Sequence, residues 1–278
     1  MLAPLLFLGC SFFIIAASVG SIYALGVQRD IVTLSIDRDL KTQIEMPLAY
    51  VTATHREEVH ETTAPSSDSN DSNMPDIEYI AGIDSNLLRQ IDFQRLQAIN
   101  SDAYTWLCIP DTNIDYYVLQ EQVVNRYYYI WRDIYKNNST WGSLFSPKQP
   151  VEDTPDAHQI IFGHRMQNRN VAFSSLASFA DKHFADRHRY AYLYYPDRVE
   201  RWVVWASANV AETDMIYTIP YVLGSTEYDS LLNHIEQNAI LTRFDRPSAN
   251  TNTLVLSTCH NNDTRFVVVY VPDRTYYY

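Results

Sequence analysis

Eight short runs of apolar and β-branched residues constrain the fold of this 278-residue chain more than any other feature. Such runs have the composition of sheet strands, and turn-forming residues separate them. They cover residues 106–109, 114–119, 142–145, 159–163, 190–195, 201–208, 253–257 and 266–270. Many short strands at close spacing are typical of a closed barrel or a sandwich. The sequence therefore predicts a mostly-β fold.

Helical patterns interrupt the strands and also precede them. In residues 84–100, apolar side chains recur at helical spacing after two cap candidates, Asp84 and Ser85. Two further helical intervals cover residues 171–184 and 225–240, the second with Ser225 as its cap candidate. We expect an N-terminal helix and peripheral helices around the sheet.

The N-terminal part of the chain predicts an anchor and a stalk. No charged side chain occurs before Arg29, and an apolar stretch of about 20 residues is long enough to span a bilayer. The run is longer than the apolar region of a signal peptide, so we interpret residues 1–27 as a single-pass transmembrane anchor. Residues 28–76 end in a Ser-, Asp- and Asn-rich stretch and are expected to form an extracytoplasmic stalk or flexible linker. Residues 77–278 then form the folded domain.

Charge and cysteine content narrow the class of function. The formal net charge of −12 argues against a nucleic-acid partner held by counterion release. No CxxC or HExxH spacing is present, so we expect no metal site. Cys10 falls in the apolar N-terminal run and Cys108 inside a strand pattern, where a buried thiol is expected. Cys259 is then the candidate reactive thiol.

The last two strands place Cys259 beside a cation. If residues 261–263 form a three-residue loop, Cys259 pairs with Arg265, with Cβ atoms about 5 Å apart. A nearby cation lowers the pKa of a thiol and so favours the nucleophilic thiolate. Arginine cannot act as a base, because its own pKa exceeds about 12, but it can donate to negative charge that develops on a substrate carbonyl.

A general base is sought among eight histidines. Only His164 closes an apolar strand, and the preceding Gly163 allows close backbone approach. We take His164 as the candidate base, with a purely structural or exposed histidine as the alternative.

These residues fall in motifs that resemble those of the sortase family. "TLVLSTCHNNDTRFVVV" is similar to the sortase cysteine and arginine strands, and "IIFGHRMQNRNVAFSSLASFADKHF" resembles the histidine strand and the helix that follows it. "DAYTWLCIPDTNIDYYVLQ" and "WGSLFS" resemble the class B branch, as does a helix in the connection before the cysteine strand. The resemblance runs from about residue 84 to the C-terminus.

The resemblance implies an eight-stranded sortase-type β-barrel and transpeptidation at a Gram-positive-type cell surface, by a membrane-anchored enzyme with an extracellular catalytic domain and no cofactor. Cys259 would attack the sorting motif of a secreted protein and form a thioester. An amine of a cell-wall precursor or of a pilin would resolve it. His164 would serve as acid and base, and Arg265 would hold substrate and stabilise the oxyanion. The residues expected to bind substrate are Ser257, Thr258 and Ile130.

Two alternatives stay open from the residues alone. The same site would give a cysteine peptidase if water outcompetes the amine, and a non-catalytic surface β-barrel module would use none of these residues together. Residues 127–131 add aromatic side chains where class B enzymes line the substrate groove, and these side chains could equally pack on the barrel.

Overall fold

The computed structural model describes residues 39–45, 85–87, 89–120, 127–147, 157–166, 169–218, 220–259 and 264–278. Short 3₁₀ helices carry the label η. The elements in chain order are η2 (Ser85–Leu87), α3 (Phe93–Ile99), β1 (Ala103–Cys108), β2 (Asp115–Gln120), η3 (Tyr128–Trp131), β3 (Leu144–Ser146), β4 (His158–His164), η4 (Leu176–Ala180), α4 (Lys182–Arg187), β5 (Tyr190–Tyr194), β6 (Arg198–Ala211), η5 (Met215–Tyr217), α5 (Thr226–Asn238), β7 (Ala239–Thr242), β8 (Thr253–Cys259) and β9 (Thr264–Tyr277).

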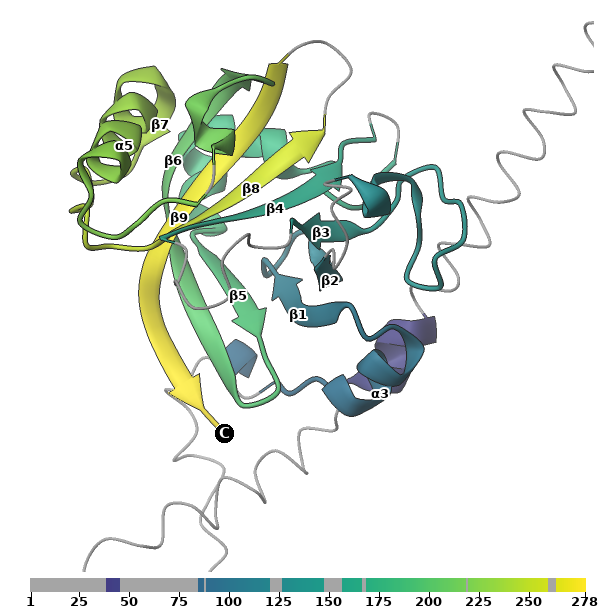
Figure 1. Cartoon of the computed structure of the whole chain (residues 1–278). Helices are drawn as coiled ribbons and strands as arrows, with labels where there is room; N and C mark the ends of the chain where they lie inside the picture. The colour runs from purple at the N-terminus through teal and green to yellow at the C-terminus, as the bar shows by residue number, and fades with distance from the viewer. Residues whose placement is uncertain are drawn as a thin grey trace, which may run out of the picture.

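The strands form one sheet that closes into a barrel (Figure 1). The hydrogen-bonded order is β5-β1-β2-β3-β4-β8-β9-β6, and β6 also pairs with β5, which closes the ring. A closed ring leaves no exposed sheet edge within it. The prediction of a mostly-β, eight-stranded barrel is confirmed, and each of the eight predicted strands is present.

A ninth strand, β7, was not predicted. It pairs with residues 206–208 of β6, whereas β5 pairs with residues 199–203 of the same strand. One edge of the long strand β6 therefore pairs first with β5 and then with β7. The other edge of β6 pairs with β9 from Arg198 to Ala211. The sequence of β7, Ala-Ile-Leu-Thr, follows α5 directly, with no turn-forming residue between them. In the sequence, these residues therefore look like the end of the helix.

Alternating side chains of the barrel strands divide the core into two clusters. The inner cluster receives residues from all eight barrel strands: Leu107, Val118, Leu144, Ile161, Leu193, Val204, Leu256 and Val268. The outer cluster holds the alternate positions together with residues from α3 and α5: Trp106, Tyr117, Phe145, Phe162, Tyr192, Ala206, Val255, Val267, Leu96 and Leu231. Because successive side chains of a strand point to opposite faces, the first cluster fills the barrel and the second covers its outside.

The helices cover the barrel at separate places. Figure 1 shows α5 beside β6 and β7, and α3 beside β1. Ser225 accepts a hydrogen bond from Tyr228 N, which confirms the predicted cap of α5. Leu176 and Phe179 of η4 join the inner cluster, so the segment after β4 closes the barrel interior.

The predicted helix start at Asp84–Ser85 is wrong. Only η2 forms there, and α3 begins at Phe93, after the cap Asp92, whose carboxylate accepts from Arg95 N. Ile91 forms a β-bridge with Glu45, so the backbone just before α3 is held extended by a part of the chain far away in sequence.

Residues 39–45 pack against the barrel, although the predicted division places them in the stalk. Residues 39–44 are helical, and Leu40 and Ile44 are fully buried in the outer cluster. The other residues of the predicted stalk and the predicted anchor at 1–27 lie outside the described residues. Among those that are described, no helix has the length and apolar character needed to cross a membrane.

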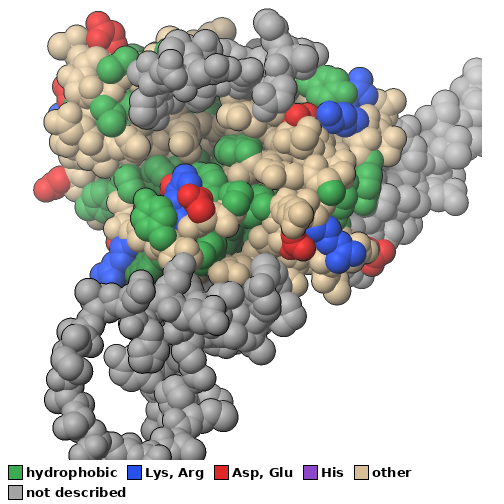
Figure 2. All heavy atoms as spheres, turned by 60° about the horizontal axis from the view of Figure 1, so that its bottom comes forward, with side chains coloured by type: hydrophobic (Ala, Val, Ile, Leu, Met, Phe, Trp, Pro, Cys, Tyr) green, Lys and Arg blue, Asp and Glu red, His purple; other side chains and the backbone are tan. Residues whose placement is uncertain are grey.

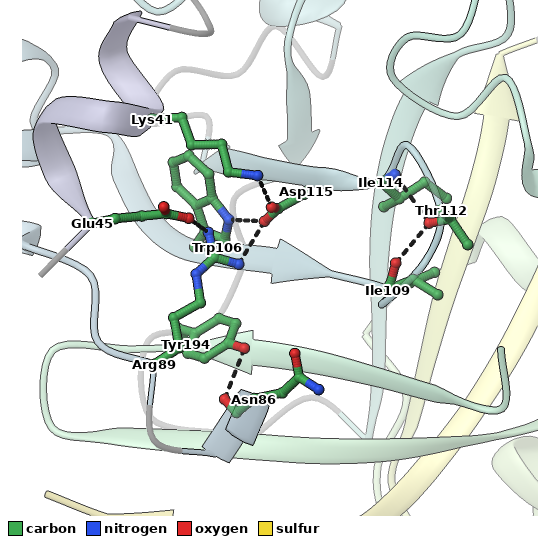
Figure 3. A network of polar contacts seen from close by, with 10 residues as sticks. All are labelled: Lys41, Glu45, Asn86, Arg89, Trp106, Ile109, Thr112, Ile114, Asp115 and Tyr194. Atoms are coloured by element: carbon green, nitrogen blue, oxygen red, sulfur yellow. Dashed lines mark hydrogen bonds and ion pairs between the residues drawn. The ribbon is translucent and has the colours of Figure 1, made fainter. Parts of the chain in front are cut away.

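A charge network holds this N-terminal helix on β1 and β2 (Figure 3). The carboxylate of Asp115 accepts from Lys41 Nζ, from Arg89 Nη1 at 2.7 Å and from Trp106 Nε1 at 2.6 Å. Arg89 also pairs with Glu45. Burial raises the pKa of Asp115, but Arg89, Lys41 and Trp106 outweigh burial and hold the pKa below its ordinary value of 3.8.

We expect Asp115→Asn to lower the free energy of unfolding by about 2 kcal/mol at pH 7, because it leaves the half-buried cations Arg89 and Lys41 without their shared partner. The folded-state pKa of Asp115 is depressed, so its contribution is present above the unfolded-state pKa and is lost as pH falls through the folded-state pKa. Urea unfolding should therefore show a difference between wild type and variant that shrinks below about pH 4. Asp197→Asn, at a carboxylate that is 66% exposed, is the control and should cost less than about 0.5 kcal/mol. Equal losses for both variants would contradict this role.

Candidate active site

The parallel pair β4 and β8 brings two of the predicted site residues together. Their register runs from His158 opposite Thr253 to His164 opposite Cys259, so the last residues of the two strands are direct neighbours across the ladder (Figure 1). Neighbouring strands lie about 4.8 Å apart. The backbone alone therefore places the histidine and the cysteine positions side by side.

Strand β9 brings the third position to the same end of the sheet. β8 and β9 are antiparallel, and the pairs run to Ser257 opposite Val267. This is the register expected from the sequence, in which position 265 continues opposite position 259. Arg265 is 8% exposed and pairs along the backbone with Val210 of β6.

Strand alternation assigns His164 and Arg265 to the outer face of the barrel. His164 is in phase with Phe162, and Arg265 is in phase with Val267, both of which belong to the outer cluster. Val255, in phase with position 259, belongs to it as well. The three predicted catalytic positions thus share one face at the ends of three adjacent strands.

Gly163 fixes how closely β4 packs at the step before His164. A Cβ built at this glycine would lie 2.4 Å from Leu144 Cδ2 and 2.7 Å from Phe173 Cδ2. Only a residue without a side chain fits between these two groups. The sequence prediction of close packing at Gly163 is confirmed.

The imidazole of His164 is held by a backbone carbonyl. Its Nε2 lies 2.7 Å from the carbonyl oxygen of Ile130, and the ring lies 4.5 Å from the ring of Trp131, centroid to centroid. A carbonyl oxygen can only accept, so Nε2 carries the proton in this contact. In the neutral imidazole, Nδ1 then has the free lone pair.

The predicted aromatic segment at 127–131 divides between two roles. Tyr129 is 1% exposed and hydrogen-bonds Asp102, which is packing, whereas Trp131 is 57% exposed and covers His164. Gly142 allows the backbone of residues 129 and 130 to pack closely against it. Gly142 has φ +58°, and a Cβ there would lie 2.2 Å from the oxygen of Ile130, the same oxygen that binds His164.

Burial and a neighbouring cation set the protonation of His164. Burial lowers the pKa of His164, the bond to Ile130 partly opposes this, and the charge of Arg265 lowers the pKa further, so the imidazole is neutral at pH 7. Arg265 itself donates from Nη2 to Glu212 Oε1 at 2.6 Å. Nothing in the sequence around Glu212, which follows β6, had indicated this pair.

The predicted substrate-binding residues lie next to these positions. Ser257 and Thr258 are fully buried. Ser257 Oγ and the hydroxyl of Tyr217 are 2.8 Å apart, while Thr258 Oγ1 bonds the backbone N and O of Phe266 across the hairpin. Ile130 is half-buried, and its backbone carbonyl binds the His164 ring. This contact does not depend on the side chain of residue 130, so the sequence could not indicate it.

Other titratable groups are accounted for by packing. His158, at the opposite end of β4, is fully buried between Thr253 Oγ1 and the carbonyl of Ile216, and burial lowers its pKa to about 4. Burial together with Asp115 raises the pKa of Cys108 to about 12, so its thiol stays protonated. Across the described ranges, no group of three or more His, Cys, Asp or Glu residues is placed to hold a metal ion.

Comparisons with known proteins agree with this arrangement. No family model matches the chain. Sortase B of Listeria monocytogenes is 27% identical over 168 residues, which is 60% of this chain and 67% of that protein. A Streptococcus pyogenes class B sortase involved in pilus biogenesis is 26% identical with a TM-score of 0.57, over 65% of this chain and 97% of that one. A Staphylococcus aureus sortase B–substrate complex, at 20% identity and a TM-score of 0.59, covers 66% of this chain and 85% of that one and shows the likeness of fold.

The barrel is the fold that this chain shares with sortase B, and the comparisons support a sortase enzyme, a cysteine transpeptidase. The similarity in sequence and in fold supports a class B sortase family for this chain.

We expect Gly142→Ala to lower the pKa of His164 by moving the Ile130 carbonyl that binds its ring. The new Cβ would displace the Ile130 carbonyl, and the positive φ adds strain of about 1 kcal/mol or more. NMR titration should place the His164 midpoint below its ordinary 6.5 in wild type and lower still in the variant, because the bond to Ile130 favours the charged ring.

Gly224→Ala is the matched control. Gly224 also has a positive φ, +75°, but its Cβ would approach only the side chain of Asn250. This variant should lose stability from strain without moving the His164 midpoint. A His164 midpoint that is the same in both variants and in wild type would show that the Ile130 carbonyl does not position the ring.

Proposed function

We propose that Cys259, His164 and Arg265 form the catalytic centre of this sortase and that it cleaves the sorting motif of a secreted protein. The Cys259 sulfur attacks the scissile carbonyl carbon, the peptide bond breaks, and the amine fragment leaves with a proton. The acyl group then sits on sulfur as a thioester. An amine of a cell-wall precursor or of a pilin attacks that thioester, forms a new amide bond and releases the thiol.

The observation that carries the proposal is the register of β4 and β8. In this register the backbone of His164 pairs with that of Cys259, which supports proton transfer between a nucleophile and its base. The same face receives Arg265 from β9.

The bond between His164 and Ile130 supports a specific proton path. Because Nε2–H donates to the Ile130 carbonyl, Nδ1 is the nitrogen that takes the thiol proton. The resulting imidazolium gives that proton to the departing amine, and the neutral ring then accepts a proton from the incoming amine. The lowered pKa of His164 keeps the ring in the accepting form at the start.

Arg265 supplies directed positive charge in this scheme. Its guanidinium is anchored by Glu212, and its charge lowers the pKa of His164, which supports a place for Arg265 in the same centre. A fixed donor aimed at the carbonyl oxygen stabilises the negative charge that develops there. Substrate contacts from Ser257, Thr258 and Ile130 are part of the proposal, on the grounds of their position beside these groups.

Hydrolysis is the second candidate activity, because water can resolve the same thioester. A fluorescent sorting-motif peptide, incubated with and without an amine, separates the two activities by product. Mass spectrometry of the trapped enzyme identifies the acylated residue. Transpeptide product and acylation at Cys259 are expected, whereas hydrolysis that the amine does not divert would assign the chain to the cysteine peptidases.

We expect Arg265→Lys to reduce turnover of that peptide by roughly 10²–10³-fold, the scale for losing one oxyanion donor. Lysine keeps the charge but lacks the planar fork of the guanidinium. Cys259→Ala should form no thioester and serves as the inactive control. If Arg265→Lys retains more than about a third of wild-type turnover, the directed hydrogen bond is not the role of Arg265.

We also propose that residues 1–27 anchor the enzyme in the cell membrane with the catalytic domain outside, as the uncharged N-terminal run supports. Because Leu40 and Ile44 are buried in the domain, a shortened chain should begin near Gln28 and not after the stalk. Cell fractionation should place the full chain with membranes and the chain from Gln28 in the soluble fraction. Recovery of both in the same fraction would contradict the anchor.

A further inference from the structure

The carbonyl that binds His164 belongs to a short element that the barrel register does not fix. Ile130 lies in η3, a single 3₁₀ turn of four residues, and its carbonyl oxygen lies 2.7 Å from His164 Nε2. The backbone hydrogen bonds of this turn to the carbonyls of Tyr127 and Tyr129 are both 3.3 Å long, which is beyond the usual range. A turn of this kind depends on contacts with other parts of the chain for its position.

A buried polar cluster supplies such contacts one residue before Ile130. Tyr129 is 1% exposed, and its hydroxyl donates to the Asp102 carboxylate and accepts from Asn100 Nδ2 at 3.1 Å. Asn100 Nδ2 also donates to the carbonyl oxygen of Ile134 at 2.8 Å. One amide group therefore binds both η3 and the segment that follows it. Asn100, Asp102 and Tyr129 are called the Tyr129 cluster below.

The Tyr129 cluster is anchored at the junction of α3 and β1. Asn100 is the C-cap of α3 and is 4% exposed, and its side-chain oxygen accepts from Asp102 N at 3.0 Å. The carbonyl of Asp102 accepts from Gln120 N at 2.7 Å, which ties the junction to β2. The junction is thus held by the barrel, and η3 is bound to the junction through side chains.

The surroundings of Asp102 strengthen its bond to Tyr129. On the face shown in Figure 2, acidic and basic side chains lie next to one another at the surface. Asp102 also has a basic neighbour, Lys136 Nζ at 3.1 Å, but its own side chain is only 12% exposed. A carboxylate with little access to water needs donors from the protein, and a hydrogen bond to a charged acceptor is stronger than one between neutral groups. Burial and Asp102 raise the pKa of Tyr129, so its hydroxyl stays protonated and remains the donor.

The backbone of Tyr129 is held by a second part of the chain. Its carbonyl accepts from Ser143 N at 3.0 Å, and Gly142 leaves room for the carbonyls of both Tyr129 and Ile130. The turn η3 is therefore bound to the α3–β1 junction through the Tyr129 side chain and to the segment before β3 through the Tyr129 backbone. The direction of the Ile130 carbonyl depends on both attachments.

We propose that Asn100, Asp102 and Tyr129 are positioning residues of the catalytic centre, which hold η3 so that the Ile130 carbonyl binds and orients the His164 ring. This role goes beyond the packing of Tyr129 in the core. The inference rests on the proposed function, in which His164 is the base. The three residues act through the Ile130 carbonyl and not by contact with the reacting atoms. A base must be held close to its productive geometry by groups that are themselves fixed, and the Tyr129 cluster fixes this one.

Tyr129→Phe removes one hydroxyl group from the cluster and keeps the aromatic ring in the core. Without the two hydrogen bonds of that hydroxyl, the Ile130 carbonyl should hold His164 less well. NMR titration should then place the His164 midpoint lower than in wild type, because the bond to Ile130 favours the charged ring. Arg265 on β9, whose charge also lowers the pKa of His164, is unchanged by the substitution.

The same variant should lower kcat/KM for cleavage of the sorting-motif peptide roughly tenfold. A displacement of about 1 Å at the reacting groups can cost about 10²-fold, and a smaller one is expected here. The acidic limb of the pH profile of kcat/KM should move to lower pH together with the His164 midpoint, because the base acts in its neutral form.

Asp102→Asn is the milder variant. Its amide oxygen still accepts from Tyr129 but lacks the charge that strengthens the bond. The His164 midpoint and kcat/KM should change in the same direction as in Tyr129→Phe and by less, and this variant decides the question if Tyr129→Phe does not fold. Wild-type values of both quantities in every variant that folds would overturn the proposal.

Tyr194→Phe is the matched control. Tyr194 is also fully buried, and its hydroxyl donates to the carbonyl oxygen of Asn86 at 2.9 Å (Figure 3). This variant should lower the midpoint of urea unfolding about as much as Tyr129→Phe does, while the His164 midpoint and kcat/KM stay at their wild-type values. Equal shifts of the His164 midpoint in both variants would come from a general loosening of the barrel and would overturn the role of the cluster.

The His164 midpoint also separates this inference from the function on which it rests, because the NMR titration needs no turnover. A wild-type enzyme that forms no Cys259 thioester would refute the catalytic centre, while the midpoints would still show whether the cluster holds the ring. A midpoint that moves in Tyr129→Phe while kcat/KM and its pH profile stay the same would show that His164 is not the base, and would overturn the positioning role with it.

Discussion

The parallel hydrogen-bonded pairing of β4 with β8 is the constraint on which the rest of the site depends. It runs over seven pairs from His158–Thr253 to His164–Cys259, so a shift by one residue would turn the whole outer face of β8 into the barrel. The inner and outer clusters both oppose such a shift, because each strand has apolar residues on both faces. The distance between the histidine and cysteine positions is thus fixed by the burial of residues that take no part in the chemistry.

Two glycines allow the close packing that holds the imidazole of His164 in place. Gly163 lets Leu144 and Phe173 close on the strand before His164, and Gly142 lets the Ile130 carbonyl reach Nε2. The ring is therefore held from its own strand and by Ile130, which lies 34 residues earlier in the chain. Positioning by backbone groups has an advantage for a base, since a carbonyl neither titrates nor changes rotamer as the proton moves.

The local sequence pattern was sufficient for most of the barrel, and it named the three positions that the proposed catalytic centre uses. Alternating β-branched runs indicated eight strands, and a short polar loop fixed the register of β8 and β9. The features that escaped prediction depend on contacts between distant segments. Asp115 holds Lys41 across 74 positions of sequence, and the Ile91–Glu45 bridge delays the start of α3. The contact of His164 with Ile130 involves a carbonyl, which every residue has, so no side-chain pattern could have indicated it.

The electrostatics around His164 favour different forms of the ring at different stages. In the resting enzyme, burial and Arg265 both disfavour the imidazolium, so the base is ready to accept a proton. Once Cys259 has lost its proton in the proposed mechanism, a thiolate near His164 favours the charged ring, and the ring of Trp131 lies 4.5 Å from it, centroid to centroid. Arg265 meanwhile gains a new partner in the carbonyl oxygen of the substrate, and Glu212 keeps the guanidinium from carrying a full unpaired charge when that partner is absent. In the proposed mechanism, Arg265 adds to the burial that keeps the base neutral before the reaction, and it stabilises the oxyanion during it. We therefore expect that a lysine, with the same charge but no fork to bind Glu212 and substrate together, is not an equivalent replacement.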